Sequence, residues 1–310
     1  MRTLKTILPA ILAVTAAAFG VHRLLAIPGD AKDSITVDGL ERTYRLHVPP
    51  SYDGNHAVPL VIALHGRTGT GQAQERMSHL DKVSDEHGFV AIFPDGLERS
   101  WADGRGVTSS DKRGINDVKF LSELIAKLEN EYKIDPARIY AMGMSNVGFM
   151  SARLACDLAD KIVAVGIVAA SLSTNTAAPC KPAKPVSVLV IQGTKDPLVP
   201  YQGGPMGKNG ERGNILSHDA TIEKFSQLDR CAAPPRRDDT SDQANDGTSI
   251  EVVTYSACTA GTEVRGYTVE NGGHTWPGGT PYLPAMIIGK TTQNLNGSET
   301  IWEFFSGHAR

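Results

Sequence analysis

A serine next to small residues stands where an apolar segment of the chain gives way to a helical one. Residues 138–142 form a short β-branched and apolar run, typical of a buried parallel strand, and residues 146–158 carry apolar side chains at helical spacing. A strand that turns directly into a helix strains the residue at the turn and presents its side chain above the sheet edge. Ser145 occupies that turn, two residues after Gly143. The pattern predicts a nucleophilic serine, and the alternative is an ordinary serine in a loop.

A serine nucleophile needs a base within hydrogen-bonding distance and a carboxylate that holds the base in the right tautomer. In the chain order of the α/β-hydrolase fold, the acid follows a late strand and the histidine follows the last strand. Asp196 comes soon after the apolar run 186–191, and His274 comes after a strand predicted at 263–269. We therefore predict a catalytic triad of Ser145, His274 and Asp196. For Asp196 the alternative is a turn-forming aspartate that precedes a proline.

Two backbone N–H groups are candidates for stabilising the oxyanion that forms during acyl transfer. Arg67 follows His65-Gly66 at the end of an apolar run, and Asn146 follows the serine. Both residues would act through the main chain, so we expect the geometry of the turn to matter more than side-chain identity. His65 is predicted to brace the loop. A phosphate-binding role for the glycine-rich segment 66–71 is disfavoured, because no Gly-Lys-Ser/Thr follows it.

One residue departs from the usual G-x-S-x-G spacing of such a turn. The second glycine is expected at position 147, where this chain has Val147, and the glycine is displaced to Gly148. Extra bulk in a tight site typically costs about 1–3 kcal/mol. We therefore expect Val147 to weaken activity and stability, unless neighbouring residues are small enough to accept it. The alternative function is a catalytically weak or silent protein of the same fold that binds polymer or glycan.

The composition argues against several other classes of protein. The 310 residues are 41% hydrophobic and 21% charged, with a net charge of −3. Such a chain can bury a full core as one domain, and its scattered basic residues offer no stripe for nucleic acid. The sequence has no Cys-x-x-Cys pair and no pair of histidines near its cysteines, so it does not indicate a metal site. We expect no cofactor, no metal and no nucleic acid, and the sequence leaves the oligomeric state open.

The first 26 residues have the pattern of an export signal. Arg2 and Lys5 precede an apolar, alanine-rich segment over 7–21, and an alanine triplet within it is a candidate cleavage site. A retained membrane anchor is the alternative, because the apolar stretch continues beyond this segment. We expect a secreted or periplasmic protein whose single catalytic domain covers 34–310, with no stable membrane partner unless the segment is retained.

All four cysteines follow the predicted export segment. An even number of cysteines in an exported chain indicates disulfides, and four cysteines allow three pairings. We predict the pairing closest in sequence, Cys156 with Cys180 and Cys231 with Cys258. Unpaired buried cysteines are the alternative.

Apolar runs alternate with helical segments along most of the chain. A hairpin is predicted over 34–48, strands at 59–64, 89–93, 138–142, 162–168, 186–191, 249–255 and 263–269, and helices at 77–87, 115–132, 146–158, 217–228 and 298–308. Strands separated by helices form a mostly parallel sheet with right-handed crossovers. We predict the α/β-hydrolase fold, with a mostly parallel sheet of about eight or nine strands and helices on both faces.

Segments rich in glycine, proline and polar residues are predicted loops, at 201–214, 232–248 and 277–296. The first follows the candidate acid and the third follows the candidate base, so both are expected to rim the active site. Trp101 and Trp276 are predicted to flank the cleft and contact the substrate, with packing in the core as the alternative.

Several short motifs together resemble the polyhydroxybutyrate depolymerase-like and feruloyl esterase-like branch of secreted α/β-hydrolases. They are Leu64-His-Gly66, Phe93-Pro-Asp-Gly-Leu97, Asn116-Asp-Val118, Gly143-Met-Ser-Asn146, Gly193-Thr-Lys-Asp-Pro-Leu-Val-Pro-Tyr201 and Gly272-Gly-His-Thr-Trp-Pro-Gly-Gly279. The resemblance covers nearly everything after residue 34. It implies a secreted serine esterase for short-chain hydroxyalkanoate esters or polyesters, or for feruloyl or acetyl esters of plant polysaccharide, and it does not choose among them. Arg67 stands where glycine is common in the family.

Overall fold

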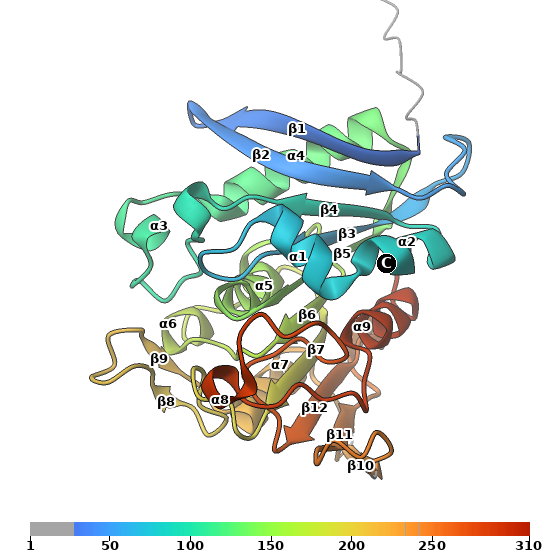
Figure 1. The fold of residues 1–310 in the computed structure, drawn as a ribbon. Helices are drawn as coiled ribbons and strands as arrows, with labels where there is room; N and C mark the ends of the chain where they lie inside the picture. Colours follow the sequence, from blue (N-terminus) through green and yellow to red (C-terminus); the bar gives the residue numbers. More distant parts are fainter. Residues whose placement is uncertain (1–27, 233, 241) are drawn as a thin grey trace, which may run out of the picture.

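The computed structural model describes residues 28–232, 234–240 and 242–310 (Figure 1), so the predicted export signal or anchor lies outside the described residues. Ten strands form one sheet in the order β1-β2-β4-β3-β5-β6-β7-β12-β11-β10, and β8 and β9 form a separate ribbon. The strands are β1 (Gly29–Val37), β2 (Leu40–Val48), β3 (Val58–Leu64), β4 (Val90–Pro94), β5 (Ile134–Met144), β6 (Ala164–Val168), β7 (Ser187–Gly193), β8 (Gly204–Pro205), β9 (Asn214–Ile215), β10 (Arg236–Thr240), β11 (Ser249–Tyr255) and β12 (Val264–Glu270).

The large sheet is parallel in its middle and antiparallel at both edges. Strands β4, β3, β5, β6, β7 and β12 pair in parallel. Strands β1 and β2 at one edge, and β11 and β10 at the opposite edge (Figure 1), pair antiparallel. The predicted fold class is therefore confirmed, and the sheet is one strand wider than the upper expectation. The additional strand, β10, lies in the segment that we predicted as a loop, because the charged side chains of this edge strand hide the usual apolar pattern.

The helices and 3-10 turns are α1 (Gly71–Ser78), α2 (Leu80–His87), η1 (Leu97–Arg99), α3 (Ser109–Lys112), α4 (Asp117–Glu131), α5 (Asn146–Asp157), α6 (Thr174–Ala177), α7 (His218–Leu228), η2 (Thr259–Gly261), α8 (Ala285–Ile288) and α9 (Gly297–Ser306). The prediction of one helix over 77–87 is wrong in its extent. The structure has two helices there, because His79 takes a φ of 51° and ends α1. The predicted hairpin is confirmed, and Asp38 and Gly39 have the positive φ values that a tight hairpin turn needs.

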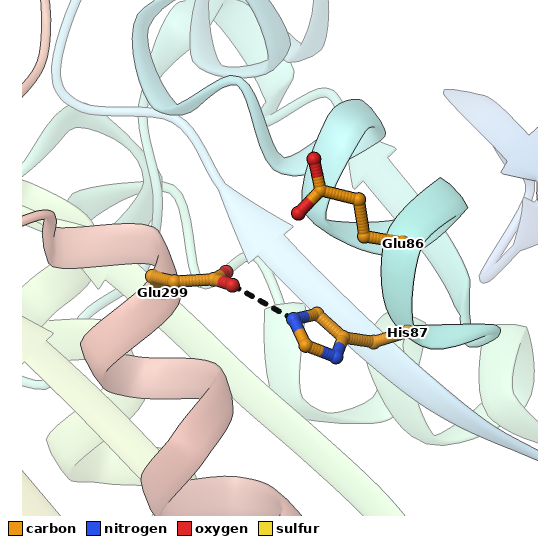
Figure 2. Close-up of side chains that lie close together, drawn as sticks. All are labelled: Glu86, His87 and Glu299. Atoms are coloured by element: carbon orange, nitrogen blue, oxygen red, sulfur yellow. Dashed lines mark hydrogen bonds and ion pairs between the residues drawn. The ribbon is translucent and has the colours of Figure 1, made fainter.

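Helices cover both faces of the sheet. Alternate residues of β3 show this, since Leu60 and Ile62 pack into the core beneath α4, α5 and α7, whereas Val61 and Ala63 pack into the core beneath α2 and α9. A hydrogen bond also joins α2 to α9, with His87 Nε2 at 2.7 Å from Glu299 Oε1 and Glu86 beside them (Figure 2). Within the described residues, no helix is long and apolar enough to cross a bilayer.

Both predicted disulfides are confirmed. Cys156 bonds to Cys180, and Cys231 bonds to Cys258, across sequence separations of 24 and 27 residues. In the chain-entropy description, loops of this length contribute roughly 3–4 kcal/mol each to stability. The first bond ties the end of α5, the helix that follows Ser145, to the segment before β7.

Candidate active site

Ser145 stands at the carboxyl end of β5, immediately before α5. Its backbone has φ 65° and ψ −124°. A positive φ costs a non-glycine residue about 1–3 kcal/mol and persists only where the surroundings enforce it. One such constraint is the bond from the Ser145 N–H to the Val168 oxygen, at 2.9 Å. The side chain is partly exposed, and its Oγ makes no hydrogen bond to another described residue. The structure therefore has the strained strand-to-helix turn that the sequence predicted.

The predicted base and acid meet directly. His274 Nδ1 lies 2.7 Å from Asp196 Oδ2, and the two residues are only 1% and 9% exposed. The other carboxylate oxygen, Oδ1, accepts hydrogen bonds from the N–H groups of Leu198 and Val199 at 2.8 and 2.9 Å. A carboxylate held in this way accepts the Nδ1 proton of the imidazole, which leaves Nε2 with the lone pair that a general base needs.

Close backbone packing brings the loops after β7 and β12 together. A Cβ at Gly193 would lie 2.3 Å from the Gly272 oxygen, so only a residue without a side chain fits at this position. On the other side, the His274 N–H donates to the Ile288 oxygen at 2.6 Å. The base is thus held by its backbone as well as by its bond to Asp196.

Ser145 and His274 line the same cavity, which has a volume of about 240 Å³. The residues that line it come from the loop after β3, from α1, from the serine turn and from the C-terminal third of the chain: His65, Gly66, Arg67, Thr68, Gly69, Ala73, Gln74, Met77, Met144, Ser145, His274, Thr280 and Tyr282. A larger and more open depression of about 720 Å³ lies beside β1 and β2 and contains no triad residue. The smaller cavity is the one with the groups that acyl transfer requires.

The two predicted oxyanion donors, the N–H groups of Arg67 and Asn146, donate to no acceptor among the described residues. For Asn146 this is expected, because the first N–H of a helix has no partner within the helix. His65 braces the loop that carries Arg67, because its Nδ1 bonds to the Gly66 oxygen at 2.8 Å and its Nε2 accepts from the Gly96 N–H at 2.9 Å. Burial lowers the pKa of the His65 imidazole, so this ring stays neutral and keeps both bonds.

The side chain of Asn146 has a larger role than the sequence indicated. Its Nδ2 donates to Asp103 Oδ2, and its Oδ1 accepts from the Trp101 N–H at 3.3 Å. Burial raises the pKa of Asp103, and Arg105, which lies 2.7 Å away, opposes this effect. Side-chain identity at position 146 therefore does matter, because it ties the start of α5 to a buried loop. The aspartate and arginine in the segment Ala-Asp-Gly-Arg after Trp101 were the available signal in the sequence.

Val147 does not crowd the serine turn in the way that we expected. Val147 is fully buried, and its side chain fills space next to Gly143. This space is free because Gly143 has no side chain, since a Cβ there would lie only 2.9 Å from the Val147 Cβ. The tight contact falls one residue later, where a Cβ at Gly148 would lie 2.4 Å from the Ala170 Cβ. The displaced glycine is therefore the residue that lets α5 approach the sheet. Val147 thus gives no structural reason to expect a catalytically silent protein.

Replacing Val147 with glycine is expected to lower the free energy of unfolding by about 2–4 kcal/mol, because it deletes a buried isopropyl group and adds the conformational entropy of glycine. Chemical denaturation of the two proteins measures this difference. Ala152→Gly, at a buried position on the same helix, is the matched control and should cost only about 1 kcal/mol. A Val147→Gly protein that is more stable and faster than the parent would restore the crowding hypothesis.

Both tryptophans predicted to contact substrate lie in the core instead. Trp101 is 0% exposed and its Nε1 donates to the His65 oxygen at 3.1 Å, whereas Trp276 is 2% exposed and its Nε1 donates to Ser298 Oγ at 3.1 Å. Neither side chain lines the cavity. The alternative, packing in the core, is therefore correct for both tryptophans, and the indole N–H of each donates to a buried acceptor.

The loop 277–296 rims the cavity as predicted, through Thr280 and Tyr282, whereas the loop 201–214 contributes no lining residue. Burial, with a smaller contribution from the charge of Asp196, raises the pKa of Tyr282 to about 12. Its hydroxyl therefore stays protonated at neutral pH, and the residue is 47% exposed although it lines the cavity. Sequence patterns alone did not single out this tyrosine among the residues of its loop.

Comparisons with known proteins show which family the chain resembles. Residues 42–183 match the family described as Esterase PHB depolymerase. A putative esterase, NocK, from Nocardia uniformis subsp. tsuyamanensis is 32% identical over 283 residues, which cover 88% of this chain and 81% of that protein. Feruloyl esterase B of Piromyces equi is 30% identical over 233 residues, but these cover 73% of this chain and only 41% of that longer protein. Among solved structures, acetyl xylan esterase from Aspergillus awamori has a TM-score of 0.61 at 11% identity, over 89% of this chain and 99% of that one, a likeness of fold alone.

Proposed function

The chain belongs to the PHB depolymerase-like and feruloyl esterase-like family of carboxylic-ester hydrolases, and we propose that it cleaves its substrates with Ser145, His274 and Asp196. One observation carries this assignment. A buried histidine, bonded to a fixed carboxylate at 2.7 Å, lines the same cavity as a serine held at a strained turn. No hydrogen bond joins Ser145 to His274 among the described residues, and such bonds commonly tighten only when substrate is bound.

In the proposed reaction, Ser145 Oγ attacks the carbonyl carbon of the ester while His274 Nε2 takes its proton. The charge that forms on the carbonyl oxygen is held by the backbone N–H groups of Arg67 and Asn146, which have no acceptor among the described residues. The carbon–oxygen bond to the alcohol then breaks, and His274 gives its proton to the leaving oxygen. Water attacks the acyl-enzyme with His274 again as base, and the acid is released. Asp196 keeps His274 in the productive tautomer throughout.

The relatives support two substrate classes for this site. They are polyhydroxyalkanoate-type polyesters, after the name of the matched family, and feruloyl or acetyl esters, after the names of feruloyl and acetylxylan esterases that are similar in sequence. We further propose export through residues 1–26 and a single catalytic domain over 34–310. The two disulfides and the single ten-stranded sheet support these proposals.

Labelling with a fluorophosphonate tests the proposed nucleophile. The wild-type protein is expected to incorporate one label, which peptide mass mapping should locate on Ser145. The same preparation should hydrolyse p-nitrophenyl acetate or butyrate, and methyl ferulate or a polyhydroxybutyrate film would then separate the two substrate classes. A protein that stays unlabelled and inactive on every ester would contradict the proposal and favour a binding protein.

A further inference from the structure

One buried tryptophan forms hydrogen bonds to both of the segments that carry the proposed oxyanion donors. The indole N–H of Trp101 donates to the backbone oxygen of His65 at 3.1 Å, in the loop that carries Arg67. The backbone N–H of Trp101 donates to Asn146 Oδ1 at 3.3 Å, at the start of α5. Trp101 therefore links the loop after β3 to the turn after β5.

The loop that carries Arg67 is held mainly by the segment that follows β4. The Gly96 N–H donates to His65 Nε2, and the Thr68 N–H donates to the Arg99 oxygen, each at 2.9 Å. With the indole bond, these contacts fix the loop on both sides of Arg67. The N–H of Arg67 has no acceptor of its own among the described residues, so the bonds of its neighbours set its direction.

The position of the tryptophan leaves little freedom. Trp101 is 0% exposed, and its ring packs against the backbone of Gly96, where a Cβ would lie 2.9 Å from the indole Cε2. The next backbone N–H, that of Ala102, donates to Asp117 Oδ2 at 2.7 Å, and Asp117 pairs with Arg42 at 2.6 Å in the core. Because a close-packed interior transmits small displacements, the two donor segments cannot move independently of this residue.

We propose that Trp101 is a positioning residue that sets the separation and direction of the two oxyanion N–H groups. Its side chain does not line the cavity, so it acts through His65 on Arg67 and through the Asn146 side chain on the Asn146 N–H. Such donors stabilise the transition state only when they point at the place where the oxyanion forms. This inference rests on the proposed function.

Trp101→Phe tests the bridge, because it removes the indole N–H and keeps an aromatic ring in the core. The His65 oxygen then loses a donor, and the loop that carries Arg67 is free to shift. A misplacement of about 1 Å can cost about a hundredfold in rate. We expect kcat for p-nitrophenyl butyrate to fall by about tenfold to a hundredfold with KM nearly unchanged, because the donors act in the transition state.

A second substrate separates a displaced oxyanion site from general damage to the structure. In the thionoester of butyrate with p-nitrophenol, sulfur replaces the carbonyl oxygen, and sulfur accepts hydrogen bonds weakly. The intrinsic reactivities of the two esters are the same for every variant, so changes in the ratio of their kcat/KM values report the two N–H donors. In Trp101→Phe the preference for the oxygen ester should shrink by about tenfold, while the pH profile keeps its shape because His274 and Asp196 are unchanged.

Trp276→Phe is the matched control. Trp276 is also buried, and its Nε1 also donates one hydrogen bond at 3.1 Å, to Ser298 Oγ. It has no hydrogen bond to either donor segment among the described residues. The change removes the same atoms from the core, so Tm should fall by a similar amount, but the ratio of the two esters should stay at the wild-type value.

Asn146→Ala tests the bridge from its other end. The variant keeps the backbone N–H of residue 146 and removes the side-chain oxygen that accepts from Trp101. Its preference for the oxygen ester should therefore also shrink. If Trp101→Phe does not fold, as judged from its Tm, the ratio measured for Asn146→Ala decides the question.

Two results would overturn the inference while leaving the esterase assignment intact. One is a folded Trp101→Phe enzyme with the wild-type kcat. The other is a Trp101→Phe or Asn146→Ala enzyme that loses rate on both esters equally, because the loss would then be structural only. Failure of the wild type to hydrolyse either ester would instead refute the proposed function, and this inference with it.

Discussion

Ser145→Ala is expected to lower kcat for p-nitrophenyl acetate by about a millionfold, because nucleophile, base and acid act as one unit in such enzymes. The fold should survive the change. Ser145 Oγ has no hydrogen bond to lose among the described residues, and the strained φ of 65° is enforced by the surrounding backbone and not by the hydroxyl. Steady-state kinetics measures the loss, and the Tm verifies that the protein remains folded.

Ser151→Ala is the matched control for this experiment. Ser151 is a buried serine on α5, and its Oγ also has no hydrogen-bond partner among the described residues. We expect it to leave kcat unchanged, so that the two variants separate loss of the nucleophile from loss of a buried hydroxyl. A Ser145→Ala enzyme that keeps more than about a hundredth of the wild-type rate would exclude Ser145 as the nucleophile, since loss of a nucleophile costs far more than that.

Asp196→Asn is expected to lower kcat by about 10⁴-fold with little change in Tm. The geometry gives the reason. The backbone N–H groups of Leu198 and Val199 both donate to Oδ1, so the amide oxygen of an asparagine would take that position and its NH₂ group would face His274. That NH₂ group donates to Nδ1, which forces the imidazole proton onto Nε2, where the base must be unprotonated.

A second carboxylate that follows a strand provides the comparison. Asp95 comes directly after β4, but it accepts from the Gly71 N–H and from Thr43 Oγ1 at 2.8 and 2.9 Å, so both of its oxygens are bonded within the turn. Asp95→Asn should therefore retain most of the activity. Equal losses in the two variants, measured as kcat over pH 6 to 9, would show that Asp196 does not orient the base.

The sequence by itself determined the features that depend on neighbouring residues. The turn around Ser145 follows from a strand that passes directly into a helix, and the placement of Asp196 and His274 follows from their position after late strands. The disulfide pairs are those closest along the chain. Helical and strand periodicity likewise predicted the class of fold, because each element must bury its apolar side against the sheet.

Only the tertiary structure decided features that depend on contacts between distant segments. Gly143, across the turn, leaves the space that Val147 occupies. The helix α5 comes closest to the neighbouring segment at Gly148, because Ala170 lies opposite this glycine. Trp101 lies in the core, and the sequence could not show this, because a residue of an irregular loop belongs to no periodic pattern from which burial can be predicted. The structure also buries Gln74, whose amide has no hydrogen-bond partner among the described residues, whereas an isolated glutamine on a short helix is expected at the surface.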